Sequence, residues 1–226
     1  MGLGAPAVLA ALIAWLAVPR LVSALFLLPG DAAIDLVEAG IRPSEAGIFR
    51  AIEAQGQSLR YLPQADPHLR TAYLALSLAE SSSLPAAEES ELIEVGSYHL
   101  VRALSLSPAQ PRGWFMLAGL RLRAGDRPAA AEALSMSLLT NPHLSLLAPL
   151  RWPLALELGA GLSKEERERS NLEFLSFFRF QPETALRIAL REDRLAELKA
   201  LAGDRGEDRE RLSGVLERLQ FDRPGA

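Results

Sequence analysis

A long apolar run opens the chain. Residues 3–28 (LGAPAVLAALIAWLAVPRLVSALFLL) contain one charged residue, Arg20, and one hydroxyl, Ser23. As a helix this run would be about 39 Å long, against a hydrocarbon thickness of about 30 Å, so it can cross a bilayer with a tilt or a kink. We therefore predict that residues 1–30 form a single transmembrane anchor, which contacts the lipid bilayer through residues 3–28.

Within this run we assign membrane anchoring to Trp15, Pro19 and Arg20. Pro19 lacks a backbone donor, so we expect a kink there. Arg20 would cost about 2.5–3.5 kcal/mol at the bilayer centre, unless it extends towards the headgroups or pairs with an acid on a partner helix. Two alternatives stay open. One is a signal peptide cleaved near residues 22–24, although no basic segment precedes the apolar run; the other is a buried helix of a soluble protein.

Beyond the anchor, apolar residues recur at helical spacing with short turn signals between the stretches. Ala and Leu are abundant and β-branched residues rarely interrupt them, which favours an all-α fold. Pro63, Pro67, Pro108 and Pro142 each follow an amphipathic stretch, and the last two are 34 residues apart. We expect residues 31–66 to form a helical lead-in or a degenerate copy of the repeat that follows.

Residues 111–144 carry the clearest repeat pattern. Its apolar and small positions are Trp114, Leu117, Ala118, Ala130 and Leu134. Small residues where two helices cross permit close approach, while Trp and Leu fill the space between the helices. The pattern resembles the tetratricopeptide repeat (TPR), a helix pair with a 34-residue period. Gly125 and Asp126 suit the turn between the two helices, whereas Arg121 replaces a usual Tyr and Ser137 a usual Ala.

A second, less regular unit precedes this one. We expect its first helix over residues 67–80 and its second over residues 91–108, with Gly96 where the helices cross. Residues 81–90 would then form a connecting loop longer than the family usually has. The resemblance therefore implies TPR-like repeats over residues 67–144.

Helices continue through the C-terminal region, residues 145–226. One is expected around residues 145–159, and residues 163–166 (SKEE) match a capping box that begins another. The charged residues 203–210 are typical of a solvated turn. We predict an all-α fold in which an N-terminal transmembrane helix precedes a short TPR-like α-solenoid, closed by C-terminal capping helices.

The TPR resemblance also implies a partner-binding surface, because the first helices of such repeats line a concave groove. It places on this groove Arg112, Phe115, Gly119, Leu122 and, at the edge, Arg123. Apolar side chains at two of these positions suit an amphipathic helix or an extended peptide. The alternative is that the C-terminal helices fold into the groove and that these residues belong to the core.

No sequence pattern points to catalysis. His68, His99 and His143 are widely separated and form no HxxH or HExxH motif, and the chain has no cysteine. We expect His99 to be a partly buried residue of a helix. The sequence also contains no nucleophile elbow and no phosphate-binding glycine motif. We therefore expect a protein that is not an enzyme, with no catalytic, metal or cofactor site and no small-molecule substrate.

Charge and layout complete the functional expectation. The net charge of −4 argues against nucleic acid as a partner, and 22 arginines against 2 lysines are typical of a GC-rich bacterial genome. We expect a single-pass protein of the bacterial inner membrane, with its body in the periplasm, that scaffolds other membrane or periplasmic proteins. The layout is also similar to that of small anchored repeat proteins associated with exopolysaccharide biosynthesis and export. The alternative is an accessory transmembrane subunit of an enzyme complex, acting mainly through its anchor.

Overall fold

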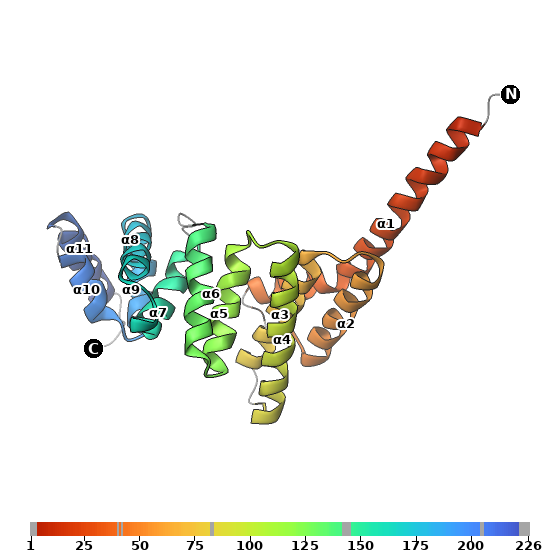
Figure 1. The fold of residues 1–226 in the computed structure, drawn as a ribbon. Coiled ribbons are helices and arrows are strands. Elements are labelled where there is room, and N and C mark those ends of the chain that lie inside the picture. The colour runs from red at the N-terminus through yellow and green to blue at the C-terminus, as the bar shows by residue number, and fades with distance from the viewer. Residues whose placement is uncertain are drawn as a thin grey trace. The chain divides into compact units, whose positions relative to one another are not determined.

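The computed structural model describes residues 4–39, 41, 43–81, 84–141, 146–203 and 206–221. Every regular element in these ranges is a helix, so the predicted all-α class is confirmed (Figure 1). Contacts divide the chain into two compact units, unit 1 with residues 1–124 and unit 2 with residues 125–226.

Unit 1 contains the helices α1 (Gly4–Glu38), α2 (Glu45–Tyr61), α3 (Ala65–Ser81), α4 (Ala86–Leu106) and α5 (Pro111–Arg123). Unit 2 contains α6 (Arg127–Thr140), α7 (Ala148–Leu158), the short 3-10 helix η1 (Gly159–Gly161), α8 (Lys164–Phe180), α9 (Pro182–Arg191), α10 (Leu195–Gly203) and α11 (Gly206–Phe221).

Helix α1 has a free half and a packed half. It continues without a break through Pro19 and Pro29, and its N-terminal part extends away from the other helices of unit 1 (Figure 1). From Ser23 onward one face packs on α2, where the Ser23 and Ser58 hydroxyls are hydrogen-bonded at 2.7 Å. One helical span, Ala7–Val37, is long and apolar enough to cross a membrane by length and composition. The apolar run and the part of α1 that packs on α2 therefore belong to one continuous helix.

The helices of unit 1 approach closely where glycine removes a side chain. A Cβ on Gly96 of α4 would lie 3.0 Å from Leu120 of α5, and one on Gly113 would lie 3.0 Å from Leu69 of α3. Gly96 thus occupies a crossing position, as the repeat pattern predicts. The same need for close contact explains why α5 tolerates Gly113 in its first turn.

The loop predicted over residues 81–90 is wrong in length. Helix α4 begins at Ala86, after Pro85, and Glu88 and Glu89 belong to its first turn. Acidic side chains are favourable there because the free backbone N–H groups carry a partial positive charge. The cluster of polar residues therefore marks the start of a helix rather than an extended connection.

The turn between Trp114 and Ala130 has the predicted chemistry. Gly125 has φ of +81°, a conformation that favours glycine, and the Asp126 carboxylate accepts a hydrogen bond from Ala129 N–H at 3.1 Å. Trp114 and Ala130 thus lie on consecutive helices, α5 and α6. The Trp114 indole N–H also donates to the Pro108 carbonyl at 2.8 Å and thereby fixes the α4–α5 connection.

Unit 2 is built around an aromatic core. The rings of Trp152 and Phe174 stack with centroids 3.9 Å apart, and Phe178, Leu186 and Val215 are buried around them. Helices α7 and α8 pack against α6, which is the helix that bears the last repeat positions. The predicted capping box of α8 is confirmed by reciprocal hydrogen bonds between Ser163 and Glu166.

The solvated turn predicted over residues 203–210 is also wrong, because most of these residues belong to a helix. Helix α11 begins at Gly206, and Asp208 in its first turn is only 2% exposed. Its carboxylate accepts two hydrogen bonds from Arg179 of α8, at 3.0 and 2.7 Å. This bidentate pair joins residues 29 positions apart, so the local charge pattern concealed it.

Candidate partner-binding groove

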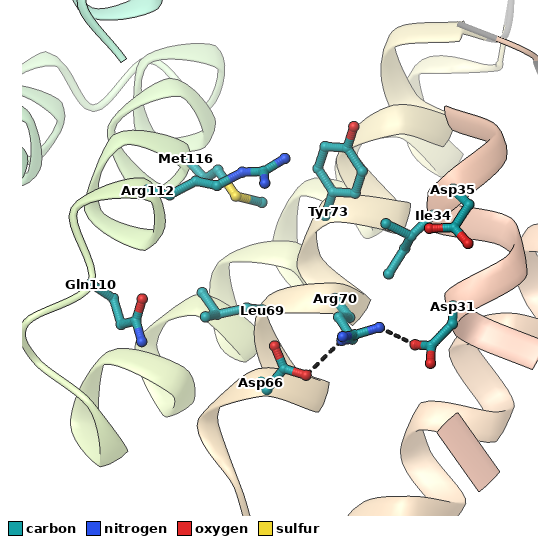
Figure 2. A pocket seen from close by; sticks show the side chains of 10 residues that line it. All are labelled: Asp31, Ile34, Asp35, Asp66, Leu69, Arg70, Tyr73, Gln110, Arg112 and Met116. Atoms are coloured by element: carbon teal, nitrogen blue, oxygen red, sulfur yellow. Dashed lines mark hydrogen bonds and ion pairs between the residues drawn. The ribbon is translucent and has the colours of Figure 1, made fainter. Parts of the chain in front are cut away.

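A groove of about 530 Å³ lies on unit 1, and three alternate helices, α1, α3 and α5, form it (Figure 2). We call it the α1–α3–α5 groove. It is lined by Asp31, Ile34, Asp35, Asp66, Leu69, Arg70, Tyr73, Gln110, Arg112 and Met116. Helices two apart in the chain thus present one continuous surface, as stacked helix pairs do.

One side of the groove is acidic. Arg70 of α3 pairs with Asp66 at 2.6 Å and also with Asp31 of α1, and Asp35 lies one turn further along α1 (Figure 2). These partly exposed pairs contribute little to stability, about 0–1 kcal/mol each. Their effect is to hold Arg70 between two carboxylates, so this side keeps a net negative charge.

The other side carries a cation above an aromatic ring. The Arg112 guanidinium carbon lies 4.9 Å from the centre of the Tyr73 ring, in cation–π geometry. Leu69, Ile34 and Met116 are the apolar residues of the lining. A groove with apolar residues and unlike charges can accept an amphipathic peptide whose own charges are placed in the opposite order.

Comparison with known proteins identifies the architecture. No protein-family model matches the chain, and no curated protein matches it in sequence. Two solved structures of MamA, a TPR-containing protein, are similar in fold at 12% identity. One covers 91% of this chain and 97% of MamA with a TM-score of 0.54, and the other covers 85% and 96% with a TM-score of 0.52. The chain has a TPR-like helical-repeat fold.

The TPR-like surface only partly coincides with the residues expected from the sequence. Arg112 lines the groove, whereas the other four expected residues are not part of its lining. Phe115 and Leu122 are half-buried, and a Cβ on Gly119 would meet open space. Arg123 pairs with Glu89 of α4 at 3.2 Å. The assignment of these four residues to partner binding remains a prediction.

The sequence pattern missed the contributions of α1 and α3. Asp31 and Asp35 lie where the anchor was expected to have ended, so no repeat position assigned them to a surface. Tyr73 and Arg70 lie in the less regular unit. Their spacing of three residues on one helix, together with the position of Arg112 in the next unit, is the signal that could have found them.

A pair of histidines joins α3 and α4. His68 of α3 and His99 of α4 face each other with their Nδ1 atoms 2.8 Å apart, although they are 31 residues apart in sequence. One ring donates and the other accepts, so the accepting ring is neutral when this bond forms. Burial lowers the pKa of His68, with Arg102 adding to the effect. Burial and the neighbouring His68 lower the pKa of His99 to about 4.

His99 is partly buried in a helix, as predicted, and its contact with His68 was not visible in the spacing of the histidines along the chain. Two histidines alone do not make a metal centre, and no group of three potential ligands occurs among the described residues. The third histidine, His143, lies outside the described residues. We assign the pair to the packing of α3 on α4.

The expected anchor residues lie on the free half of α1. Trp15 is 79% exposed, and Pro19 lies within the helix without ending it. Arg20 is exposed and donates a hydrogen bond to the Leu16 carbonyl at 2.7 Å. The structure thus leaves this half of the helix available to an apolar environment.

Proposed function

We propose that this chain is a membrane-anchored TPR-like scaffold that holds a protein partner in the α1–α3–α5 groove. The observation that carries the proposal is that α1 contributes both a free apolar half and one wall of the groove. The TPR-like fold favours a protein-binding scaffold over an enzyme. A partner held in this groove would be captured next to the bilayer.

The length of the free half supports the anchor. Residues 4–22 precede the first packed residue, Ser23, and as a helix they are about 28 Å long. This length matches a hydrocarbon core of about 30 Å, so the proposed lipid contact is shorter than residues 3–28. Arg20 would then lie about 10 Å from the centre of the segment, close to the headgroups, where its insertion cost is much reduced.

Co-purification in mild detergent tests the groove. Asp35→Arg reverses a charge on the acidic side, and we expect it to remove a partner that the wild-type chain retains. Glu94→Arg on α4 is the matched control, because it makes the same charge change on an exposed residue outside the groove. A partner lost from both variants, or retained by both, would argue against the groove.

A second function is favoured by Arg20. It is the one charged residue of the apolar run, and a chain acting through its anchor could pair it with an acid on a partner helix. In that case the chain would be an accessory transmembrane subunit of an enzyme complex. Loss of the partner in Arg20→Leu, with retention in Asp35→Arg, would favour this function over the scaffold.

The layout of one apolar helix ahead of helix pairs supports a cellular setting for the chain. We propose a bacterial inner membrane with the body of the chain in the periplasm, in a complex that makes or exports an envelope polysaccharide. A C-terminal reporter that is active only outside the cytoplasm tests the topology. Polymer yield in a deletion strain tests the pathway.

A further inference from the structure

An apolar stripe runs along the exposed side of α1. It consists of Val18, Leu21, Leu25, Leu28, Ala32 and Leu36, and we call it the α1 stripe. Leu21, Leu25 and Leu28 are 61%, 58% and 60% exposed. From Val18 to Ala32 the steps are three, four, three and four residues, which is the spacing of a coiled-coil seam. The opposite face of the same helix is buried, at Ser23, Gly30 and Ala33.

Beside this stripe lies a second groove, of about 900 Å³, between α1 and α2. We call it the α1–α2 groove. From α1 it is lined by Phe26, Pro29, Ala32, Ala33 and Leu36, and from α2 by residues that include Gly47, Arg50, Glu53 and Ala54. The α1 stripe and the α1–α2 groove share Ala32 and Leu36 and thus form one surface.

This surface is the starting face of the helix array. Ile48 and Ala51 of α2 belong to a buried cluster with Leu74 and Leu78 of α3, where the next helix pair begins. The α1–α2 groove draws its lining from α1, from α2 and from Pro43 and Ser44 in the connection between them, and no residue of α3 is part of it. Repeat arrays need a polar cap at such a face, because each helix pair otherwise offers its neighbour an apolar side. Here the face is apolar, and a helix from another chain can complete it.

The charges beside the α1–α2 groove indicate that the chain which completes this face is a second copy of the same protein. Arg50 and Glu53 are one turn apart on α2, carry opposite charges and both line the groove. In a two-fold arrangement Arg50 of one copy approaches Glu53 of the other, and the reverse pair forms at the same time. A surface that carries one charge of each sign beside an apolar centre is thus complementary to itself.

Membrane anchoring supplies the orientation. Copies anchored by the same segment enter the bilayer in the same direction, so two α1 helices meet in parallel around an axis normal to the membrane. The seam continues into the free half at Ala7, Ala11 and Ala14, and small residues permit close contact between helices in lipid. We propose that two copies of this chain associate side by side through the α1 stripe and the α1–α2 groove. The parallel orientation rests on the proposed membrane anchoring.

Disulfide cross-linking in native membranes tests the dimer, since the chain contains no cysteine. Single cysteines are placed in the full-length chain at Leu25, Leu28 and Ala32. Leu27 and Ile34 are the matched controls on other faces of the same helix turns. Because a disulfide needs Cα atoms about 4.4–6.8 Å apart, we expect at least about five-fold more covalent dimer at the stripe positions. Equal yields at all positions, or no dimer at the stripe, would overturn the proposal.

A charge exchange gives a second readout. Arg50→Glu alone should lower the dimer yield of the Leu28→Cys chain, and Arg50→Glu combined with Glu53→Arg should restore it. No restoration would contradict the two-fold pairing. A disulfide or photo-adduct to a different protein at the stripe would show a heterologous helix there. Protection of the stripe from water-soluble maleimide without any adduct would show lipid contact, and either result overturns the dimer.

Flotation of the same membranes separates this inference from the proposed function. If the chain floats with lipid but forms no dimer through the α1 stripe, the proposed anchor stands and the proposed dimer is wrong. If the chain does not float, both the proposed anchor and the parallel orientation are wrong.

Discussion

Serine at position 137 departs from the alanine usual in TPR units, and the structure gives the reason. The Ser137 hydroxyl accepts a hydrogen bond from Nε of Arg151 at 3.0 Å. Arg151 is fully buried, donates further to the Ser137 and Asn141 carbonyls at the end of α6, and pairs with Glu173 at 2.8 Å. The arginine thus satisfies carbonyl groups at the C-terminus of α6 while it joins α6, α7 and α8.

Replacing Arg151 should therefore be costly. Arg151→Met leaves the Glu173 carboxylate buried without its partner, and we expect a loss of about 3–5 kcal/mol in the free energy of unfolding of unit 2. Urea denaturation followed by tryptophan fluorescence measures it, since Trp152 is stacked in that core. Arg151→Met/Glu173→Leu also removes the buried carboxylate, so part of the stability should return, while the Ser137 and Asn141 carbonyls still lack the donor that Arg151 supplied. A single variant as stable as the wild type would contradict this role.

The histidine pair predicts a dependence of stability on pH. The pKa of His99 is lowered to about 4 in the folded chain, against 6.5 for the free side chain. Between these values the unfolded chain binds more protons, so stability falls as the pH is lowered from about 6.5 to about 4. The expected loss is about 1–3 kcal/mol. Thermal unfolding followed by circular dichroism measures it, and His99→Gln should show a flatter profile over this window. An unchanged profile in the variant would exclude the pair as the cause.

At the scale of the helix, close packing of α1 on α2 depends on one glycine. A Cβ on Gly30 would lie 1.9 Å from Nε2 of Gln55, whose side chain is itself fully buried. The buried Gln55 side chain occupies the space that a Cβ at position 30 would need, so any larger residue there requires Gln55 to move.

Gly30→Ala should displace the buried Gln55 side chain and lower the free energy of unfolding by about 1–3 kcal/mol. Gly56→Ala is the matched control, because it lies on the exposed face of α2 with no heavy atom within 4 Å of the added Cβ. Alanine is the better helix former, so the control should gain about 0.5–1 kcal/mol. Denaturant midpoints of the two variants compare them directly. Equal shifts in the same direction would show that the Gln55 contact is not limiting.

Helix positions followed from the sequence where the signals were local. The Ser163 capping box, the Gly125 turn and the buried Ala130 all depend on a few neighbouring residues. The two loops that were predicted wrongly, over residues 81–90 and 203–210, contain acidic residues of first helical turns. In the sequence, such a cluster of charges looks the same as a solvent-exposed loop. Most of the groove was not predictable, because Asp31, Tyr73 and Arg112 meet only when three helices stack.

For the whole molecule, the free half of α1 predicts where the chain resides. A chain that begins at Ser23 keeps every residue that packs on α2 and lacks the free apolar half. We expect the full-length chain to float with lipid vesicles and to resist carbonate extraction, and the shortened chain to remain in the aqueous fraction with its helix content retained. Gradient flotation and circular dichroism measure the two properties. Flotation of the shortened chain would contradict the anchor.

The unbroken course of α1 has a mechanical consequence. Asp31 and Asp35 lie on the same continuous helix as Trp15, with no loop between them. If the free half of α1 rotates or changes its tilt in the bilayer, the Asp31 and Asp35 carboxylates move with it. The wall that α1 contributes to the α1–α3–α5 groove then moves as well. A change in bilayer thickness or lipid packing would thereby alter the groove in which the proposed protein partner is held.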